Sequence, residues 1–217
     1  MVDVGLTARR FGSDSARLLR PPWRALRRGQ LARFWLGPAA AATVLLLSEV
    51  ARHPTGQAFL QRWAIMRGDQ PWWLTLEKVP LSLFAPARLL PCGFAMLQVF
   101  VVLGAAQVLL GAPRTLAIAL AGHVLGSYSL LLWVEAGPPV GLPAWCLHLP
   151  DAGPSVAVLT VAVYLVVALR VFWLAGLLLA YHVAEWFAIA GIAQREHLVG
   201  AAVGALAALA APIPDPD

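Results

Sequence analysis

The sequence predicts an all-α fold, specifically a polytopic membrane protein built from transmembrane helices. Of the 217 residues, 60% are hydrophobic and 12% are charged, whereas about a quarter of the residues in a typical soluble domain are charged. The apolar residues gather in runs close to the ~20 residues that cross the hydrocarbon as a helix. Because a soluble core of this size could not bury so much apolar surface, we expect lipid to cover it.

We expect six of these runs to be transmembrane helices of one domain over residues 31–211. Their approximate limits are 31–50, 89–110, 115–133, 155–169, 172–192 and 197–211. Residues 51–88 are too polar to span, and their clustered Trp residues favour a loop in the membrane interface. The Pro/Asp-rich residues 212–217 are expected to form a disordered tail.

Positive charge concentrates at the N-terminus. Eight of the sixteen Lys and Arg residues lie there: Arg9, Arg10, Arg17, Arg20, Arg24, Arg27, Arg28 and Arg33. Since cytoplasmic flanks of membrane proteins are rich in Lys and Arg, the N-terminus is expected in the cytoplasm. Six spans bring Arg114, Arg170 and the C-terminus to the same side, which gives ten basic residues inside and six outside. The predicted location is the plasma membrane, crossed several times, with both termini cytoplasmic.

The basic N-terminal tail, residues 1–30, suits a membrane surface better than a nucleic acid. No aromatic or strand pattern accompanies the arginines, which argues against nucleic-acid binding, and anionic lipid headgroups would attract them. The tail has no short apolar stretch with a cleavage site, so the first span is expected to act as the insertion signal. A short interfacial helix is expected near residues 15–28, broken by Pro21 and Pro22.

Two residues are candidates for chemistry, because each opens a helix that runs inward from the outer surface. Ser155 begins the fourth span and His197 begins the sixth, so their side chains are expected at similar depth. A hydroxyl beside an imidazole can act as nucleophile and general base, and free N–H groups at a helix N-terminus stabilise an oxyanion. The alternative interpretation is a helix-capping Ser155 and an interfacial His197.

Small residues near both candidates favour close helix packing. Gly200 and Gly204 lie one and two turns below His197, and Ala162 lies two turns below Ser155. Small residues at a four-residue spacing let transmembrane backbones approach closely. We therefore expect the helices around the two candidates to pack in near contact.

The order of these features carries a family resemblance. A large interfacial first loop, a serine that opens the fourth span after a glycine, and a histidine that opens the sixth before glycine-rich turns resemble the rhomboid intramembrane serine proteases. Residues 104–114 are similar to the end of the rhomboid second span. Residues 122–127 and 151–155 are similar to divergent rhomboid-like proteins of actinobacteria. The resemblance covers roughly residues 31–211.

The resemblance implies a Ser-His dyad in which Ser155 is the nucleophile and His197 the general base. It also implies that Gly153, Val156 and His123 support the oxyanion or the local structure.

This sequence departs from the rhomboid pattern at two places. Val156 follows the serine where rhomboids usually have glycine. Cys92 and Met96 stand where the family's second span usually carries a His-x-x-x-Asn pair that helps to stabilise the oxyanion, and neither is a good donor.

Two functions follow from the resemblance. One is an intramembrane serine protease, a hydrolase that cleaves single-span membrane proteins. The other is a catalytically inactive pseudoprotease that binds transmembrane helices as a chaperone or as a subunit of a membrane complex. The expected partners are membrane lipids and transmembrane helices of other membrane proteins, and no cofactor is expected.

Further ionisable residues fall within the predicted spans, where such groups are functional candidates. His182 and Glu185 lie one turn apart on the fifth span and are expected to pair with each other. His123 and His182 lie at similar depth, as two axial haem ligands would, but a hydrogen-bonded structural role is the favoured interpretation for His123.

The cysteines are few. Cys92 and Cys146 both fall on the outer side, where they either form a disulfide or stay unpaired. No Cys/His cluster has the spacing of a zinc site, so no metal is expected, and no phosphate-binding loop occurs.

Overall fold

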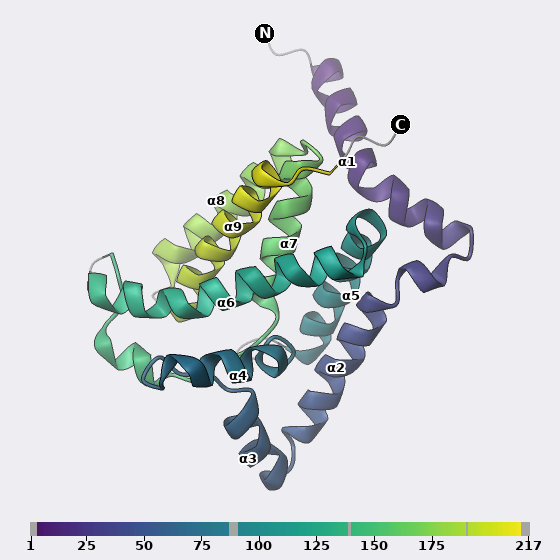
Figure 1. Ribbon diagram of the computed structural model, residues 1–217. Coiled ribbons are helices and arrows are strands. Elements are labelled where there is room, and N and C mark those ends of the chain that lie inside the picture. The colour runs from purple at the N-terminus through teal and green to yellow at the C-terminus, as the bar shows by residue number, and fades with distance from the viewer. Residues whose placement is uncertain (1–3, 87–90, 139, 190, 214–217) are drawn as a thin grey trace.

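The computed structural model describes residues 4–86, 91–138, 140–189 and 191–213, and the regular structure in them is helical (Figure 1). The α-helices are α1 (Val4–Arg27), α2 (Leu36–Val50), α3 (Pro54–Trp63), α4 (Trp72–Ser82), α5 (Cys92–Leu110), α6 (Ala112–Ala136), α7 (Ser155–Ala168), α8 (Phe172–Ala188) and α9 (Ile192–Ala210). Two short 3-10 helices are η1 (Leu31–Arg33) and η2 (Ala144–His148). No strand forms in these ranges, and the all-α prediction is confirmed.

Two helices, α5 and α6, are long and apolar enough to cross a membrane. Three others are apolar but shorter, since α2 has 15 residues, α7 has 14 and α8 has 17. These features indicate association with a membrane. The total of six spans stays a prediction.

Several helix ends differ from the predicted limits. The helix of the first predicted span, α2, begins at Leu36, because Leu31–Arg33 form η1. The prediction of a short helix near residues 15–28 that Pro21 and Pro22 break is wrong, because α1 extends from Val4 to Arg27 and runs through both prolines. α1 instead changes direction near its middle (Figure 1), since a proline can bend a helix without ending it. The predicted tail at 212–217 lies outside the described residues from 214 onward.

The segment between the first two predicted spans contains two short helices, α3 and α4, which contact each other. α4 also packs against α6. Exposed Trp side chains are found on both, at Trp63, Trp72 and Trp73. The polar segment is therefore a folded part of the domain that presents aromatic residues at its surface.

The core of the domain is built around α7. Its residues are buried from Val156 to Val161 and again from Val163 to Val166, and it contacts α5, α6, α8 and α9. A helix that is apolar on all sides and surrounded by other helices is the expected centre of such a bundle.

Glycines bring α6 and α9 against α7. A Cβ atom placed on Gly122 of α6 would lie 1.9 Å from Thr160 Oγ1, and one on Gly204 of α9 would lie 2.3 Å from the Thr160 carbonyl oxygen. Gly200 meets Val156 and Thr160 in the same way, at 2.9 Å. Ala162, two residues beyond Thr160, lies on another side of α7.

The long helices alternate in direction. At one end, Arg33 Nη2 donates to the Val108 carbonyl at 3.0 Å, beside the start of α2 and the end of α5. Arg114, at the start of α6, contacts Tyr164 near the end of α7 and the Ala211 carbonyl after α9. Arg17 of α1 donates to the Leu169 carbonyl at 3.4 Å. Arginines from three parts of the chain therefore gather at one end of the bundle.

Candidate functional site

Backbone hydrogen bonds hold the loop that leads into Ser155. Met66 and Asp151 exchange two of them, each 2.9 Å long, and the Gly153 N–H donates to the Ser82 carbonyl at 2.9 Å. Gly153 has φ +125°, a conformation that residues with a Cβ rarely adopt. The loop thus fixes Ser155 as the first residue of α7, at the end opposite the arginines.

His123 supports this loop from α6. It is only 2% exposed, and its Nε2 shares a hydrogen bond of 3.2 Å with the hydroxyl of Ser82, whose carbonyl anchors Gly153. His182 instead bonds to Glu185 on α8, so the two histidines have different partners. His123 contacts the anchor of the Ser155 loop.

Val156 fills the junction of three helices. It is 4% exposed, and its Cγ1 would lie 2.8 Å from a Cβ on Gly126 of α6 and 2.9 Å from one on Gly200 of α9. The side chain after the serine therefore occupies the space that the two glycines leave.

His197 turns toward α8 rather than bonding to Ser155. Neither of its ring nitrogens has a hydrogen-bond partner among the described residues, so the hydrogen bond of the predicted dyad is not formed. Its ring instead lies edge-on to His182, with centroids 4.8 Å apart. Its Nδ1 lies 3.5 Å from Glu185 Oε2.

His182, Glu185 and His197 form a cluster between α8 and α9. His182 Nδ1–H donates to Glu185 Oε2 at 2.9 Å, as the sequence predicted for this pair. One ligand atom from each of the three residues can be chosen so that all lie within 4.8 Å of one another. Sequence reasoning missed the third member, because its place depends on how α9 is rotated against α8.

Two charged residues before His197 are also buried, although the sequence placed them in an outer turn. Arg195 is 4% exposed and Glu196 is 2% exposed, both within α9. The Arg195 guanidinium lies over the Trp186 ring, 5.6 Å from its centroid, and Nη2 donates to the Gly141 carbonyl at 3.3 Å. These contacts accommodate the Arg195 guanidinium in the first turns of α9.

Asp151 lies next to this region, in the loop before Ser155. Burial raises the pKa of its carboxyl from the usual 3.8 to about 6, although hydrogen bonds from the Ala152 N–H and the Ser127 hydroxyl act in the opposite direction. Both the protonated and the ionised form of the Asp151 carboxyl are therefore populated near pH 6.

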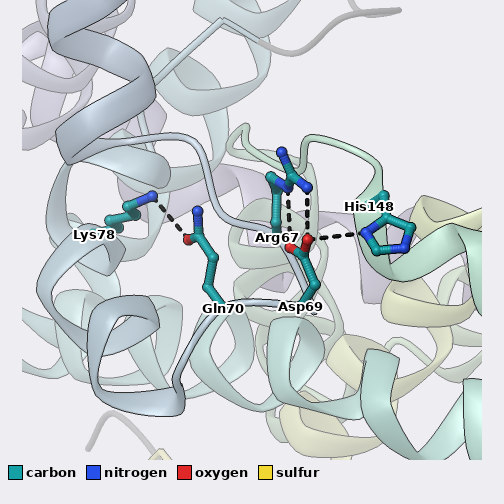
Figure 2. Close-up of polar contacts among 5 residues, drawn as sticks. All are labelled: Arg67, Asp69, Gln70, Lys78 and His148. Carbon is teal, nitrogen blue, oxygen red and sulfur yellow. Dashed lines mark hydrogen bonds and ion pairs between the residues drawn. The ribbon is translucent and has the colours of Figure 1, made fainter.

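A second polar cluster, near the same end of the molecule, joins the 64–71 segment to η2 (Figure 2). Asp69 accepts two hydrogen bonds from Arg67, at 2.6 and 3.0 Å, and one from His148 Nδ1 at 2.9 Å. These partners lower the pKa of Asp69 to about 2. Lys78 Nζ donates to the carbonyls of Gln61 and Ile65 and to Gln70 Oε1. Each charge here has a partner, which points to a structural role.

A hollow of about 370 Å³ opens beside this second cluster. Its walls come from residues 66–75, α6 and Asp151, and its polar groups include Thr75, Ser127 and Asp151. Neither Ser155 nor His197 lines it. The hollow is therefore separate from the predicted dyad.

Cys92 and Cys146 are both free. Cys146 is buried and Cys92 is half-buried, so of the two alternatives left open by the sequence, the unpaired state is observed.

Two comparisons with known proteins found no match. No protein-family model matches the chain, and no curated protein matches it significantly in sequence.

Proposed function

We propose that the chain is a rhomboid-like protein with six spans, formed by α2 and α5–α9, and with α3 and α4 in the outer interface. Three features support this topology: the helices alternate in direction, α7 lies at the centre, and arginines gather at one end. That end is the cytoplasmic one under the positive-inside rule.

The short α7 fits this proposal. Its 14 residues rise about 21 Å, less than the roughly 30 Å of the hydrocarbon. Because other helices surround α7, it does not need to match the bilayer thickness. Ser155 would then lie in a recess below the outer surface.

We propose further that the protein binds transmembrane helices of other membrane proteins, as a chaperone or complex subunit, and does not cleave them. One observation carries this choice: the two ring nitrogens of His197 make no hydrogen bond to Ser155, and the imidazole lies against His182 and Glu185. A serine without a base is a weak nucleophile. The absence of the usual donors at Cys92 and Met96 acts in the same direction.

Intramembrane serine proteolysis is the second candidate. Ser155 opens α7, His197 lies in the second turn of the adjacent α9, and Gly200 and Gly204 hold α9 in near contact with α7. Catalytic hydrogen bonds are often long before substrate binds. Proteolysis would require the His197 side chain to rotate from Glu185 toward α7.

A reconstitution experiment separates the two candidates. Purified protein in liposomes is mixed with a labelled single-span reporter, and both energy transfer and cleavage are measured, with a fluorophosphonate probe as a third readout. We expect energy transfer without cleavage, and no probe labelling beyond that of Ser155→Ala.

The controls give each outcome a meaning. Ser155→Ala should bind the reporter as the wild type does, while Gly204→Leu, which separates α9 from α7, should bind it less. Cleavage or probe labelling that is lost in Ser155→Ala would replace the binding proposal with the protease. A wild type that shows neither energy transfer nor cleavage would reject both.

A further inference from the structure

The cluster of His182, Glu185 and His197 has the chemistry of a metal site. His182 and Glu185 lie one turn apart on α8, so both side chains leave the same face. His197 reaches them from the second turn of α9, and α8 and α9 contact each other (Figure 1). Two imidazoles and one carboxylate form the ligand set that zinc uses in sites with one position open.

The spacing of the donor atoms suits one ion. Glu185 Oε2 lies 2.9 Å from His182 Nδ1 and 3.5 Å from His197 Nδ1. With metal–ligand bonds of about 2.0–2.2 Å, neighbouring donors in a tetrahedral shell lie about 3.3–3.6 Å apart. The three donors are all within 4.8 Å of one another, so small side-chain rotations would close the shell.

The cluster is largely buried, and one of its members lacks hydrogen bonds. The side chain of His182 is 10% exposed, that of His197 is 11% and that of Glu185 is 18%. Both ring nitrogens of His197 are buried without a hydrogen bond, and an unsatisfied buried polar group costs about 1–3 kcal/mol. The single His182–Glu185 hydrogen bond leaves that deficit in place. An ion bound between the three residues would remove it for the nitrogen that it takes.

An aromatic side chain lies beside the cluster, because Tyr181 packs edge-on against His182 with ring centroids 4.9 Å apart. The Glu185 side chain is 18% exposed, and the charge of a largely buried carboxylate acts more strongly on a cation than it would in water.

We propose that His182, Glu185 and His197 bind one divalent transition-metal ion of the Zn²⁺ type, with a fourth position open to water or to a donor from another molecule. The proposal goes beyond the binding of transmembrane helices and does not depend on it. It also gives a reason for the direction in which His197 points.

The test measures metal binding directly. Wild-type protein in detergent is stripped with a chelator, and Zn²⁺ is titrated into it by calorimetry, while Co²⁺ is added to a second sample and the visible spectrum is recorded. We expect one Zn²⁺ per chain with a Kd below about 1 μM, and intense Co²⁺ bands typical of a four-coordinate site. Zn²⁺ binding weaker than about 10 μM, or an octahedral Co²⁺ spectrum, would overturn the proposal.

Matched variants assign the ligands. Glu185→Gln keeps the shape of the side chain, and both it and His182→Ala should weaken Zn²⁺ binding by at least about 100-fold. His53→Ala, which removes an exposed histidine distant in sequence, is the control and should bind as the wild type does. Equal affinity in Glu185→Gln and the wild type would assign the metal to another place. Should a variant elute as an aggregate in size-exclusion chromatography, the wild-type Co²⁺ spectrum decides.

Discussion

Gly204 is a position where one added methyl group should push α9 away from α7. A Cβ there would lie 2.3 Å from the Thr160 carbonyl oxygen and 3.1 Å from the Tyr164 amide nitrogen, and ordinary contact begins near 3.4 Å. Both neighbours are backbone atoms of α7, which cannot rotate away, so α9 would have to move outward by about 1 Å. Overpacking of this kind costs about 1–3 kcal/mol. The gain in helix propensity from Gly to Ala is at most about 1 kcal/mol.

We therefore expect Gly204→Ala to lower the free energy of unfolding by about 2 kcal/mol. The assay is denaturant unfolding in detergent micelles, followed by Trp fluorescence. Gly176→Ala on α8 is the matched control, because nothing lies within 4 Å of the Cβ it adds, and it should be neutral or stabilising by up to about 1 kcal/mol. A Gly204→Ala protein as stable as the control would refute the close packing of α7 and α9.

Three further predictions concern Gly153 and Asp151, in the loop before Ser155, and Lys78 of α4. Gly153→Ala should destabilise the protein by about 1–3 kcal/mol in the same unfolding assay, because φ is +125° at this position. Stability should fall as the pH rises from about 4 to about 6, because burial raises the Asp151 pKa from 3.8 to about 6. In that range the folded state keeps the Asp151 proton that the unfolded state has lost. Asp151→Asn should flatten that part of a pH–stability curve, and an unchanged curve would contradict the assignment. Lys78→Met should lower the free energy of unfolding by about 2–3 kcal/mol. The reason is that Lys78 is 3% exposed and its Nζ donates to three acceptors, which the variant leaves without a donor. A Tm equal to that of the wild type would contradict this prediction.

α3 and α4 lie in the polar segment that was expected to form a loop. The helices α2 and α5–α9 could be predicted from the sequence, because each is an apolar run over several turns. Their ends could not, and α9 shows why. Arg195 and Glu196 interrupt the hydropathy pattern, yet the helix includes both. The guanidinium of Arg195 is accommodated by the Trp186 ring and the Gly141 carbonyl, which are far from it in sequence. A pattern along one chain segment does not contain such contacts.

The candidate site could be predicted only in part, for the same reason. The sequence identified Ser155 and His197 as residues that open helices, and it identified the His182–Glu185 pair from its spacing of three residues. Whether His197 faces α7 or α8 depends on the rotation of α9, which Gly200 and Gly204 set through their contacts with Thr160 and Val156. Side-chain direction across a helix interface is a tertiary property. The three-residue cluster appears only when the interface is built.

Val156 is buried between three helices and follows Ser155 directly, so its substitution tests both the packing and the reactivity of the serine. In rhomboids, the family proposed for this chain, a glycine usually stands at this position and leaves room for an oxyanion beside the serine. Here the side chain is 4% exposed and its Cγ1 fits against Gly126 and Gly200, so its removal leaves a cavity. Val156→Gly should cost about 3 kcal/mol, roughly 2 from the lost side chain and 1 from helix propensity.

Val156→Gly should also fail to create a reactive serine, because opening the pocket does not bring His197 away from Glu185. Fluorophosphonate labelling of Val156→Gly should therefore equal that of the double variant with Ser155→Ala. Val156→Ala, which keeps the Cβ, is the control for stability and should lose less. Strong labelling of Ser155 in Val156→Gly would show that the valine alone suppresses a competent dyad, and the position of His197 against Glu185 would then be a resting state of an enzyme.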